Sequence, residues 1–320
     1  MPDFLKIGDG TGRPARDVQK DILTWVSDNW QSRNLVMQLP VAVGKSFIAR
    51  AIQHVTGAHV ITPSNILIDQ YTDTYRGANF LKGKAHYTCN NGLMSCHDWQ
   101  DGAGQKPCPG CPYATNRAAA CNQPTFFNPM SLYYATAQEK WERPRVIVVD
   151  EAHQLNSMIL MMAGTRLRKS EYKFDESVLN ERHMVAWLDF QIERLRRMAT
   201  YYATDKTRSA EITAEVRSLS MVRAGYYESA QNYATWIEDG KHRGRKEQFL
   251  NIKPLRPPRH IAQKLLDAHR IIMMSGTMFE PDIRDLVGDA PYSFLDVDSP
   301  IPADRRPIHF EPAPYKMNFE

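Results

Sequence analysis

Arg145-Val146-Ile147-Val148-Val149-Asp150-Glu151-Ala152-His153 is the stretch that decides the fold of this chain. Four β-branched residues run without a polar interruption, which is typical of a strand buried on both faces of a parallel sheet. Ligands of open α/β sheets bind at the carboxyl edge of the strands. We therefore predict that Asp150 holds Mg²⁺, directly or through water, and that Glu151 orients or deprotonates an attacking water. A solvated acidic turn is the alternative for this stretch taken alone.

A second half-site for a nucleotide lies upstream. Residues 35–39 form a short apolar run, residues 40–46 read Pro-Val-Ala-Val-Gly-Lys-Ser, and a helical pattern follows over residues 47–55. Strand, tight turn and helix are the parts of a phosphate-binding P-loop. Backbone N–H groups at Val43 and Gly44 would cradle phosphates, Lys45 would reach the β- and γ-phosphates, and the Ser46 hydroxyl would bind Mg²⁺. These residues predict an ATP site.

The P-loop pattern is incomplete. Its usual first glycine is missing, with Leu39 or Pro40 near that place, and Ala42 stands where such loops often have glycine. An added methyl group narrows the approach of backbone to phosphate. The pattern therefore favours ATP binding and leaves its strength open.

Composition indicates an ordinary soluble globular protein of about two domains, with 320 residues, 42% hydrophobic residues and 24% charged residues. The formal charge of +4 is mildly basic, which permits nucleic-acid binding without demanding it. No apolar run approaches the roughly 20 residues of a membrane-spanning helix, and the amino terminus lacks a signal-peptide core. We expect a cytoplasmic protein that does not bind a membrane.

All five cysteines fall within residues 89–121. Cys89, Cys108, Cys111 and Cys121 have the form C-x18-C-x2-C-x9-C, with Cys96 left over. In a reducing compartment this clustering favours metal ligation over disulfides. Thiolates bind zinc or iron–sulfur clusters, and the spacing does not choose between them. Unligated cysteines in a loosely folded insertion are the alternative.

The rest of the chain predicts a parallel, doubly wound α/β sheet with insertions. A helix starts near Arg16 and Gln19, where a glutamine could read the adenine edge; a merely solvated helix start is the alternative. Residues 59–63 predict a strand followed by a helix, and residues 271–274 predict another strand, ending at Ser275-Gly276-Thr277. Residues 156–264 read almost wholly helical, with two apolar stripes that would pack as an antiparallel pair. The stripes are Met184, Leu188, Ile192, Leu195, Met198 and Tyr202, and Ile212, Val216, Leu219, Ala230, Tyr233 and Ile237.

Two basic clusters lie in this helical region. The first comprises Arg194, Arg196 and Arg197, and the second is the run Lys241-His242-Arg243-Gly244-Arg245-Lys246. Either cluster would suit contact with phosphates, and a solvated face is an equally good interpretation.

The order of these features resembles the iron–sulfur DNA helicases of the XPD/DinG type over nearly the whole chain, from Arg16 to about Phe310. Arg16 and Gln19 match that family's R-x-x-Q nucleotide motif. The other matches are Gly44-Lys45-Ser46 with the end of motif I, Thr62-Pro63 and Gln70 with motif Ia, Asp150-Glu151-Ala152-His153 with the DEAH box, and Ser275-Gly276-Thr277 with motif III.

The resemblance also implies a ligand set and a domain organisation. Residues 83–89 resemble the family's G-R-x-N-Y-x-C, so Cys89, Cys108, Cys111 and Cys121 would hold a [4Fe-4S] cluster. The first RecA-like motor domain would comprise residues 1–82, 124–158 and 265–320, the last with the Ser-Gly-Thr motif and a tail. Residues 83–123 would be the cluster insertion, and residues 159–264 the helical Arch-like domain.

Two departures from the family bear on function. Val41-Ala42 replaces the usual Thr-Gly of motif I, and no Q-x-x-G-R-x-x-R segment of a second motor domain occurs in the sequence. The resemblance therefore implies the first motor half of a helicase that uses ATP and Mg²⁺ and binds single-stranded or forked DNA. The chain would be either half of a split helicase, with the second RecA-like domain in a separate chain, or a truncated product. In both cases it would need that second domain, because arginines on it stabilise the transferred phosphoryl group. The competing hypothesis is a zinc-containing accessory protein that binds single-stranded DNA and has a degenerate nucleotide site.

Overall fold

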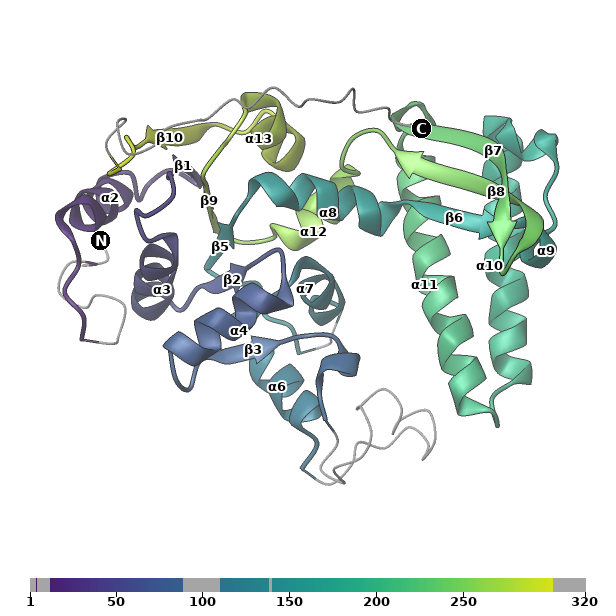
Figure 1. Cartoon of the computed structure of the whole chain (residues 1–320), viewed down its shortest axis with the longest axis horizontal. Coiled ribbons are helices and arrows are strands. Elements are labelled where there is room, and N and C mark those ends of the chain that lie inside the picture. The colour runs from purple at the N-terminus through teal and green to yellow at the C-terminus, as the bar shows by residue number, and fades with distance from the viewer. Residues whose placement is uncertain (1–3, 5–11, 89–109, 138–139, 302–320) are drawn as a thin grey trace, which may run out of the picture.

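The structure, a computed structural model, describes residue 4 and residues 12–88, 110–137 and 140–301. It consists of a sheet-based lobe and a second lobe dominated by two long helices (Figure 1). No helix in these described ranges is both long enough and apolar enough to cross a membrane.

The first lobe is built on a seven-stranded sheet with the order β10-β1-β9-β5-β2-β4-β3. All six neighbouring pairs are parallel, which confirms the predicted α/β class. Every residue of β5 is buried, as the unbroken β-branched run predicts. The strands are β1 (Asn34–Gln38), β2 (His59–Ile61), β3 (Asn79–Leu81), β4 (Thr125–Phe127), β5 (Val146–Asp150), β9 (Arg270–Ser275) and β10 (Tyr292–Asp296).

Helices cover both faces of this sheet, and successive strand residues alternate between the two resulting cores. In β5, Ile147 and Val149 pack in one core, whereas Val146 and Val148 pack in the other. One core is covered by α7 (Pro129–Ala135), α8 (His153–Ala163), α12 (Arg259–Leu265) and α13 (Glu280–Val287), and the other by α2 (Asp17–Asp28), α3 (Lys45–Thr56) and α4 (Asn65–Thr74).

The second lobe contains the predicted helix pair, α10 (Glu181–Tyr201) and α11 (Lys206–Glu228). Met184 and Leu188 of the first apolar stripe are fully buried, and Ile212 and Leu219 of the second are almost so. Both stripes contribute to one apolar cluster, which confirms that the helices pack against each other.

The prediction that residues 156–264 are almost wholly helical is wrong at three strands. β6 (Thr165–Arg168), β8 (Arg245–Pro254) and β7 (Tyr233–His242) form an antiparallel sheet in that order. Tyr233 and Ile237 of the second stripe therefore lie on β7, and Ala230 lies in a 3₁₀ turn (Ala230–Asn232). Tyr233, Thr235 and Ile237 lie at every second position, which is the period of a strand. The helical prediction used the spacing of four between Tyr233 and Ile237, which fits both periods.

Three elements were not predicted from the sequence: α6 (Pro112–Ala120) and the two edge strands, β3 and β10. Proline at the first helical position and the run Ala118-Ala119-Ala120 favour a helix at α6. Those signals were hidden within a segment rich in glycine, proline and cysteine. The remaining short helices are Lys84–His86, Lys169–Tyr172 (α9) and Glu176–Leu179.

Candidate functional site at the carboxyl edge of the sheet

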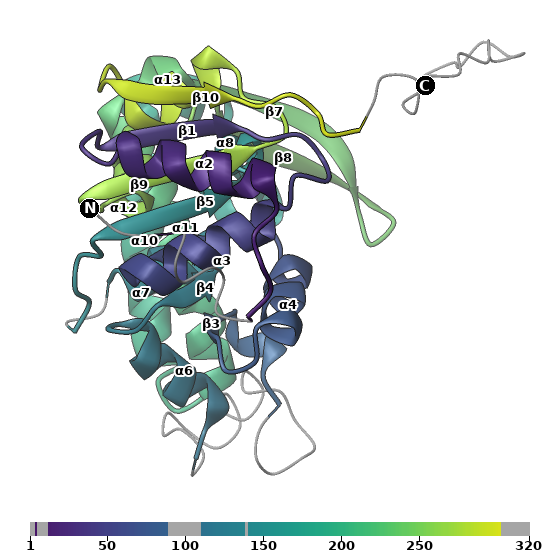
Figure 2. The same ribbon diagram turned by 90° about the vertical axis from the view of Figure 1, so that its left-hand side faces the viewer.

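The predicted nucleotide-binding residues meet at the carboxyl edge of three adjacent strands. Lys45 begins the helix after β1, Asp150 ends β5, and Ser275 ends β9, which lies between these two strands. Figure 2 shows these strands running alongside one another towards that edge. The fold thus brings together segments that lie far apart in the sequence.

Gly44 of the predicted P-loop has a left-handed backbone conformation, with φ of +89°, which favours glycine. A Cβ atom at this position would collide with the side chains of Arg16 and Gln19. Both side chains donate hydrogen bonds to the carbonyl oxygen of Val43, that of Gln19 across 3.0 Å. Arg16 and Gln19 are therefore drawn against the loop, as two separate motifs of one site should be.

Gln19 is engaged with the protein at both ends of its amide. Its Nε2 donates to Val43, and its Oε1 accepts a hydrogen bond from the backbone N–H of Arg16 across 3.0 Å. The side chain is 4% exposed. Reading an adenine edge would require these bonds to be exchanged, so adenine recognition by Gln19 stays a prediction.

Ala42 adopts a left-handed backbone conformation, with φ of +73°. A residue with a Cβ atom pays roughly 1–2 kcal/mol in this region. The missing glycine noted in the sequence therefore falls at a position where the loop needs one. This strain and the methyl group itself act against a tightly bound phosphate.

Lys45 is held by the second carboxylate of the edge. Its Nζ lies 3.2 Å from Glu151 Oε1 and donates to the carbonyl oxygen of Leu39 across 3.4 Å. The lysine side chain is 14% exposed and that of Glu151 25%, so the pair is only partly screened by water. A phosphate entering the loop would offer Lys45 a stronger anionic partner and release Glu151.

Asp150 is almost completely buried and is satisfied on both oxygens. Tyr71 donates its hydroxyl to Oδ2 across 2.9 Å, and the backbone N–H of Glu151 donates to Oδ1 across 3.0 Å. Burial raises the pKa of Asp150 to about 6, against the effect of the Tyr71 hydrogen bond, which lowers it. Ser46 lies exposed in the first turn of α3. Carboxylate and hydroxyl oxygens are hard ligands, so the residues at this edge fit Mg²⁺.

His153 contacts residues at the carboxyl ends of two strands, β5 and β9. Its Nδ1 lies 2.7 Å from the hydroxyl oxygen of Ser275 and 3.5 Å from Glu151 Oε2. Glu151 itself has a left-handed backbone, with φ of +51°. Strained backbone is frequent at functional sites, and it persists only where the surrounding contacts hold it in place. Here the contacts to Lys45 and His153 hold the Glu151 carboxylate in place.

Tyr71 is a site residue that the sequence did not reveal. Its phenol ring stacks on Phe126 with centroids 4.5 Å apart, and burial together with the Asp150 charge raises its pKa well above its usual range. The sequence placed Tyr71 only on the predicted helix after residue 63. No periodicity or motif pairs it with Asp150, so only the folded sheet brings the two together.

In this structure the two described cysteines are not arranged around one metal position. Cys111 precedes α6 and Cys121 follows it, so about 15 Å of helix rise separates them, whereas one cluster requires its thiolates close together. The Cys121 thiol lies 3.5 Å from the carbonyl oxygen of Arg117, and burial raises its pKa, which disfavours the thiolate. Cys89, Cys96 and Cys108 lie outside the described residues. Within the described ranges no group of three or more His, Cys, Asp or Glu side chains is arranged around a metal position.

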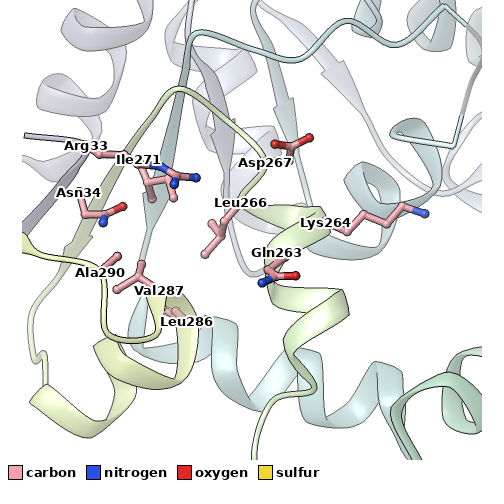
Figure 3. Close-up of a pocket in the computed structure, with 10 residues that line it drawn as sticks. All are labelled: Arg33, Asn34, Gln263, Lys264, Leu266, Asp267, Ile271, Leu286, Val287 and Ala290. Atoms are coloured by element: carbon pink, nitrogen blue, oxygen red, sulfur yellow. The ribbon is translucent and has the colours of Figure 1, made fainter. Parts of the chain in front are cut away.

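A pocket of about 470 Å³ opens at the opposite, amino edge of the sheet (Figure 3). Asn34 and Ile271, at the starts of β1 and β9, line it together with Leu266 and Leu286. None of the predicted nucleotide-binding residues lines this pocket. The predicted nucleotide-binding residues lie instead at the carboxyl edge.

Solved structures resemble this chain, although no family model and no curated protein matches it. An XPD helicase matches with a TM-score of 0.51 at 16% identity, covering 88% of this chain and 62% of its own. A truncated XPD gives 0.46 at 13% identity, covering 89% and 100%, and an apo XPD gives 0.44 at 14%, covering 88% and 57%. This chain thus spans less than two thirds of that XPD helicase. The first match shows that the chain has an XPD-like fold.

Proposed function

We propose that this chain is the ATP-binding first motor, with cluster and Arch-like insertions, of a DNA helicase of the XPD/DinG type. Its reaction would be ATP hydrolysis coupled to movement along single-stranded DNA. The observation that carries the proposal is the Lys45–Glu151 ion pair of 3.2 Å, next to buried Asp150. A P-loop lysine and two carboxylates on neighbouring strand ends are the parts that nucleoside triphosphate hydrolysis requires.

Each residue of the edge has a defined task in this proposal. The amides at the start of α3 and the Lys45 ammonium bind the phosphates, and Asp150 and Ser46 hold Mg²⁺. The metal ion, when bound, neutralises charge on the β- and γ-phosphates. Glu151, released from Lys45, orients the attacking water and accepts its proton. His153 and Ser275 keep Glu151 aligned through the contacts described above.

The proposed partners are single-stranded or forked DNA and a second RecA-like domain. Arginines on such a domain would face the γ-phosphate from the far side of the nucleotide, and their absence costs roughly 10³–10⁵ in rate. The name of the similar XPD helicase supports the helicase class. We infer that the chain alone binds ATP and DNA and turns over slowly.

The metal is part of the proposal. Cys89, Cys108, Cys111 and Cys121 are the proposed ligands of a [4Fe-4S] cluster, on the strength of their spacing and the family resemblance. For Cys121 to join Cys111 at one cluster, the end of α6 would have to unwind. Absorption in the visible range and metal analysis of the purified chain would tell iron–sulfur from zinc.

Two observations favour the second candidate, a zinc-containing protein that binds single-stranded DNA and has a degenerate nucleotide site. Ala42 occupies a left-handed position of the P-loop, and the Gln19 amide is already occupied by protein groups. Both features would weaken nucleotide binding without affecting contacts to DNA.

A titration of the purified chain with a fluorescent ATP analogue, with and without Mg²⁺, separates the two functions. We expect Mg²⁺-dependent binding that is lost in Lys45→Ala and kept in Glu151→Gln, because the latter retains the phosphate and metal contacts. Arg33→Ala, at the amino edge, is the control. Absence of nucleotide binding in the unmodified chain would refute the motor and leave the DNA-binding alternative.

A further inference from the structure

The β7–β8 hairpin ends in a compact basic tip. Its strands are ten residues long and are joined by only two residues, Arg243 and Gly244, because His242 pairs with Arg245. Four exposed cations crowd this end of the hairpin, and Figure 2 shows the hairpin projecting on the same side as the carboxyl edge of the large sheet. We call Lys241, Arg243, Arg245 and Lys246 the hairpin tip.

The carboxylates beside the tip already have other partners. Glu238 pairs with Arg166 at 2.9 Å, and Asp239 accepts a hydrogen bond from Gln248 Nε2 across 3.0 Å. Glu247 accepts hydrogen bonds from the backbone and the hydroxyl of Ser170. None of the four tip cations has an ion pair or a side-chain hydrogen bond to another described residue. Their charge is therefore available to a partner.

Two features of the tip cost stability in the chain alone. Lys241 lies directly opposite Lys246 in the antiparallel ladder, on the same face, and like charges in that position repel. Arg243 has φ of +50°, at a position of a two-residue turn where Asn or Gly is favoured. A sequence that serves only the turn would avoid both features. Contact with an anionic partner would offset both costs.

We propose that the hairpin tip binds the phosphate backbone of duplex DNA next to the single strand held by the motor. The segment that carries the hairpin tip, residues 241–246, contains no Phe, Tyr or Trp. Sites for single-stranded DNA combine contacts to phosphates with aromatic side chains on which bases stack, whereas a duplex is held through its phosphates by Lys and Arg. This inference rests on the proposed function, because it assumes that DNA is the substrate.

The test compares a forked DNA, a blunt duplex and a single strand of matched length, each titrated into the full chain at several salt concentrations. Lys241→Gln/Lys246→Gln removes two tip charges. The control Lys20→Gln/Arg33→Gln removes two charges on α2 and before β1. We expect the tip variant to bind fork and duplex roughly tenfold more weakly at low salt, with a salt slope smaller by about two, and to keep its single-strand affinity.

Arg243→Asn guards against an effect of misfolding. Asn-Gly is the preferred sequence of this turn, so the substitution is expected to raise the thermal midpoint while it lowers duplex affinity. A more stable variant that binds duplex less well cannot owe its loss to unfolding.

The possible outcomes separate the two proposals. Equal losses for single strand and duplex, no loss for either, or the same loss in the control would overturn the assignment of the tip to a duplex. Tip-dependent binding of polyglutamate as tight as that of duplex would also overturn it, in favour of an acidic protein partner. Tip-dependent duplex binding without any nucleotide binding would refute the proposed motor function and support the assignment of the tip to a duplex.

Discussion

The hydroxyl of Tyr71 donates a hydrogen bond to Asp150 Oδ2 across 2.9 Å, at the carboxyl end of β5. Tyr71 belongs to α4, the helix that follows Thr62 and Pro63, and Asp150 ends β5. The proposed metal ligand is thus positioned by a helix whose amino end reaches the same edge of the sheet. Removing the hydroxyl tests whether this contact matters for the metal.

Tyr71→Phe keeps the ring that stacks on Phe126 and loses only the hydrogen bond. Partners of a ligating carboxylate typically contribute roughly 10–100-fold to metal affinity. We expect the Mn²⁺ concentration that half-saturates the nucleotide complex, measured by electron paramagnetic resonance, to rise about tenfold. Tyr172→Phe, a buried tyrosine of the helical lobe, is the matched control. An unchanged Mn²⁺ titration would show that Asp150 needs no positioning by Tyr71.

Ala42→Gly is expected to improve the P-loop. It removes a methyl group from a left-handed position, and we expect the free energy of unfolding to rise by roughly 0.5–1 kcal/mol after the entropy cost of glycine. Nucleotide affinity is expected to rise as well. The substitution Gly44→Ala is expected to lower both, because alanine is strained at φ of +89° and its Cβ atom would displace the ends of the Arg16 and Gln19 side chains. Thermal melts and nucleotide titrations measure these effects; weaker nucleotide binding by Ala42→Gly would contradict the account of this loop.

Metal content provides a third prediction. Cys111→Ser is expected to lose the metal, because Cys108 and Cys111 form a paired-ligand turn in the sequence, and Cys96→Ser is expected to retain it. Cys121→Ser tests whether the end of α6 unwinds when the metal binds. Loss of metal would mean that the end of this helix unwinds on loading, and retention would exclude Cys121 from the ligand set. Elemental analysis and visible absorption provide the measurements.

The buried imidazole of His59 predicts a pH dependence of stability. Burial lowers its pKa to about 4, its ring stacks on Trp141, and its Nδ1 accepts from the backbone N–H of Thr125 across 3.3 Å. Below pH 6.5 the unfolded chain takes up a proton that the folded chain refuses, so stability falls as the pH falls from 6.5 towards 4. Between pH 6.5 and 5 this amounts to roughly 1.6 kcal/mol. Urea unfolding at both pH values should show that this part of the decrease is absent in His59→Gln; an equal decrease in the variant would contradict it.

The central sheet was predictable because its strands carry their signal locally. The run of β5 is β-branched throughout, and the apolar runs of β1 and β9 are too short for a helix. Each is followed by residues that suit a phosphate or metal site. Gly44, Lys45 and Asp150 could therefore be placed at one edge before the fold was known.

The second lobe and the finer contacts were not predictable in the same way. Tyr233 and Ile237 fit a helical period as well as a strand period, and only their pairing with Pro254 and Leu250 settles the matter. The bonds of Gln19 to the P-loop likewise depend on how α2 lies against α3. Such contacts follow from tertiary packing, which overrides local pattern.

The strand order also dictates when the site can be assembled. In the described sheet β1 has β9 and β10 as its neighbours, so Asn34 pairs with Ile271 and Tyr292. A chain emerging from the ribosome makes the P-loop early, but its flanking strands arrive only after the whole helical lobe has been synthesised. Long-range pairing of this kind is slow and leaves strand edges exposed in the meantime. In the nascent chain β1 therefore stays unpaired on both sides until β9 and β10, residues 270–296, have been translated.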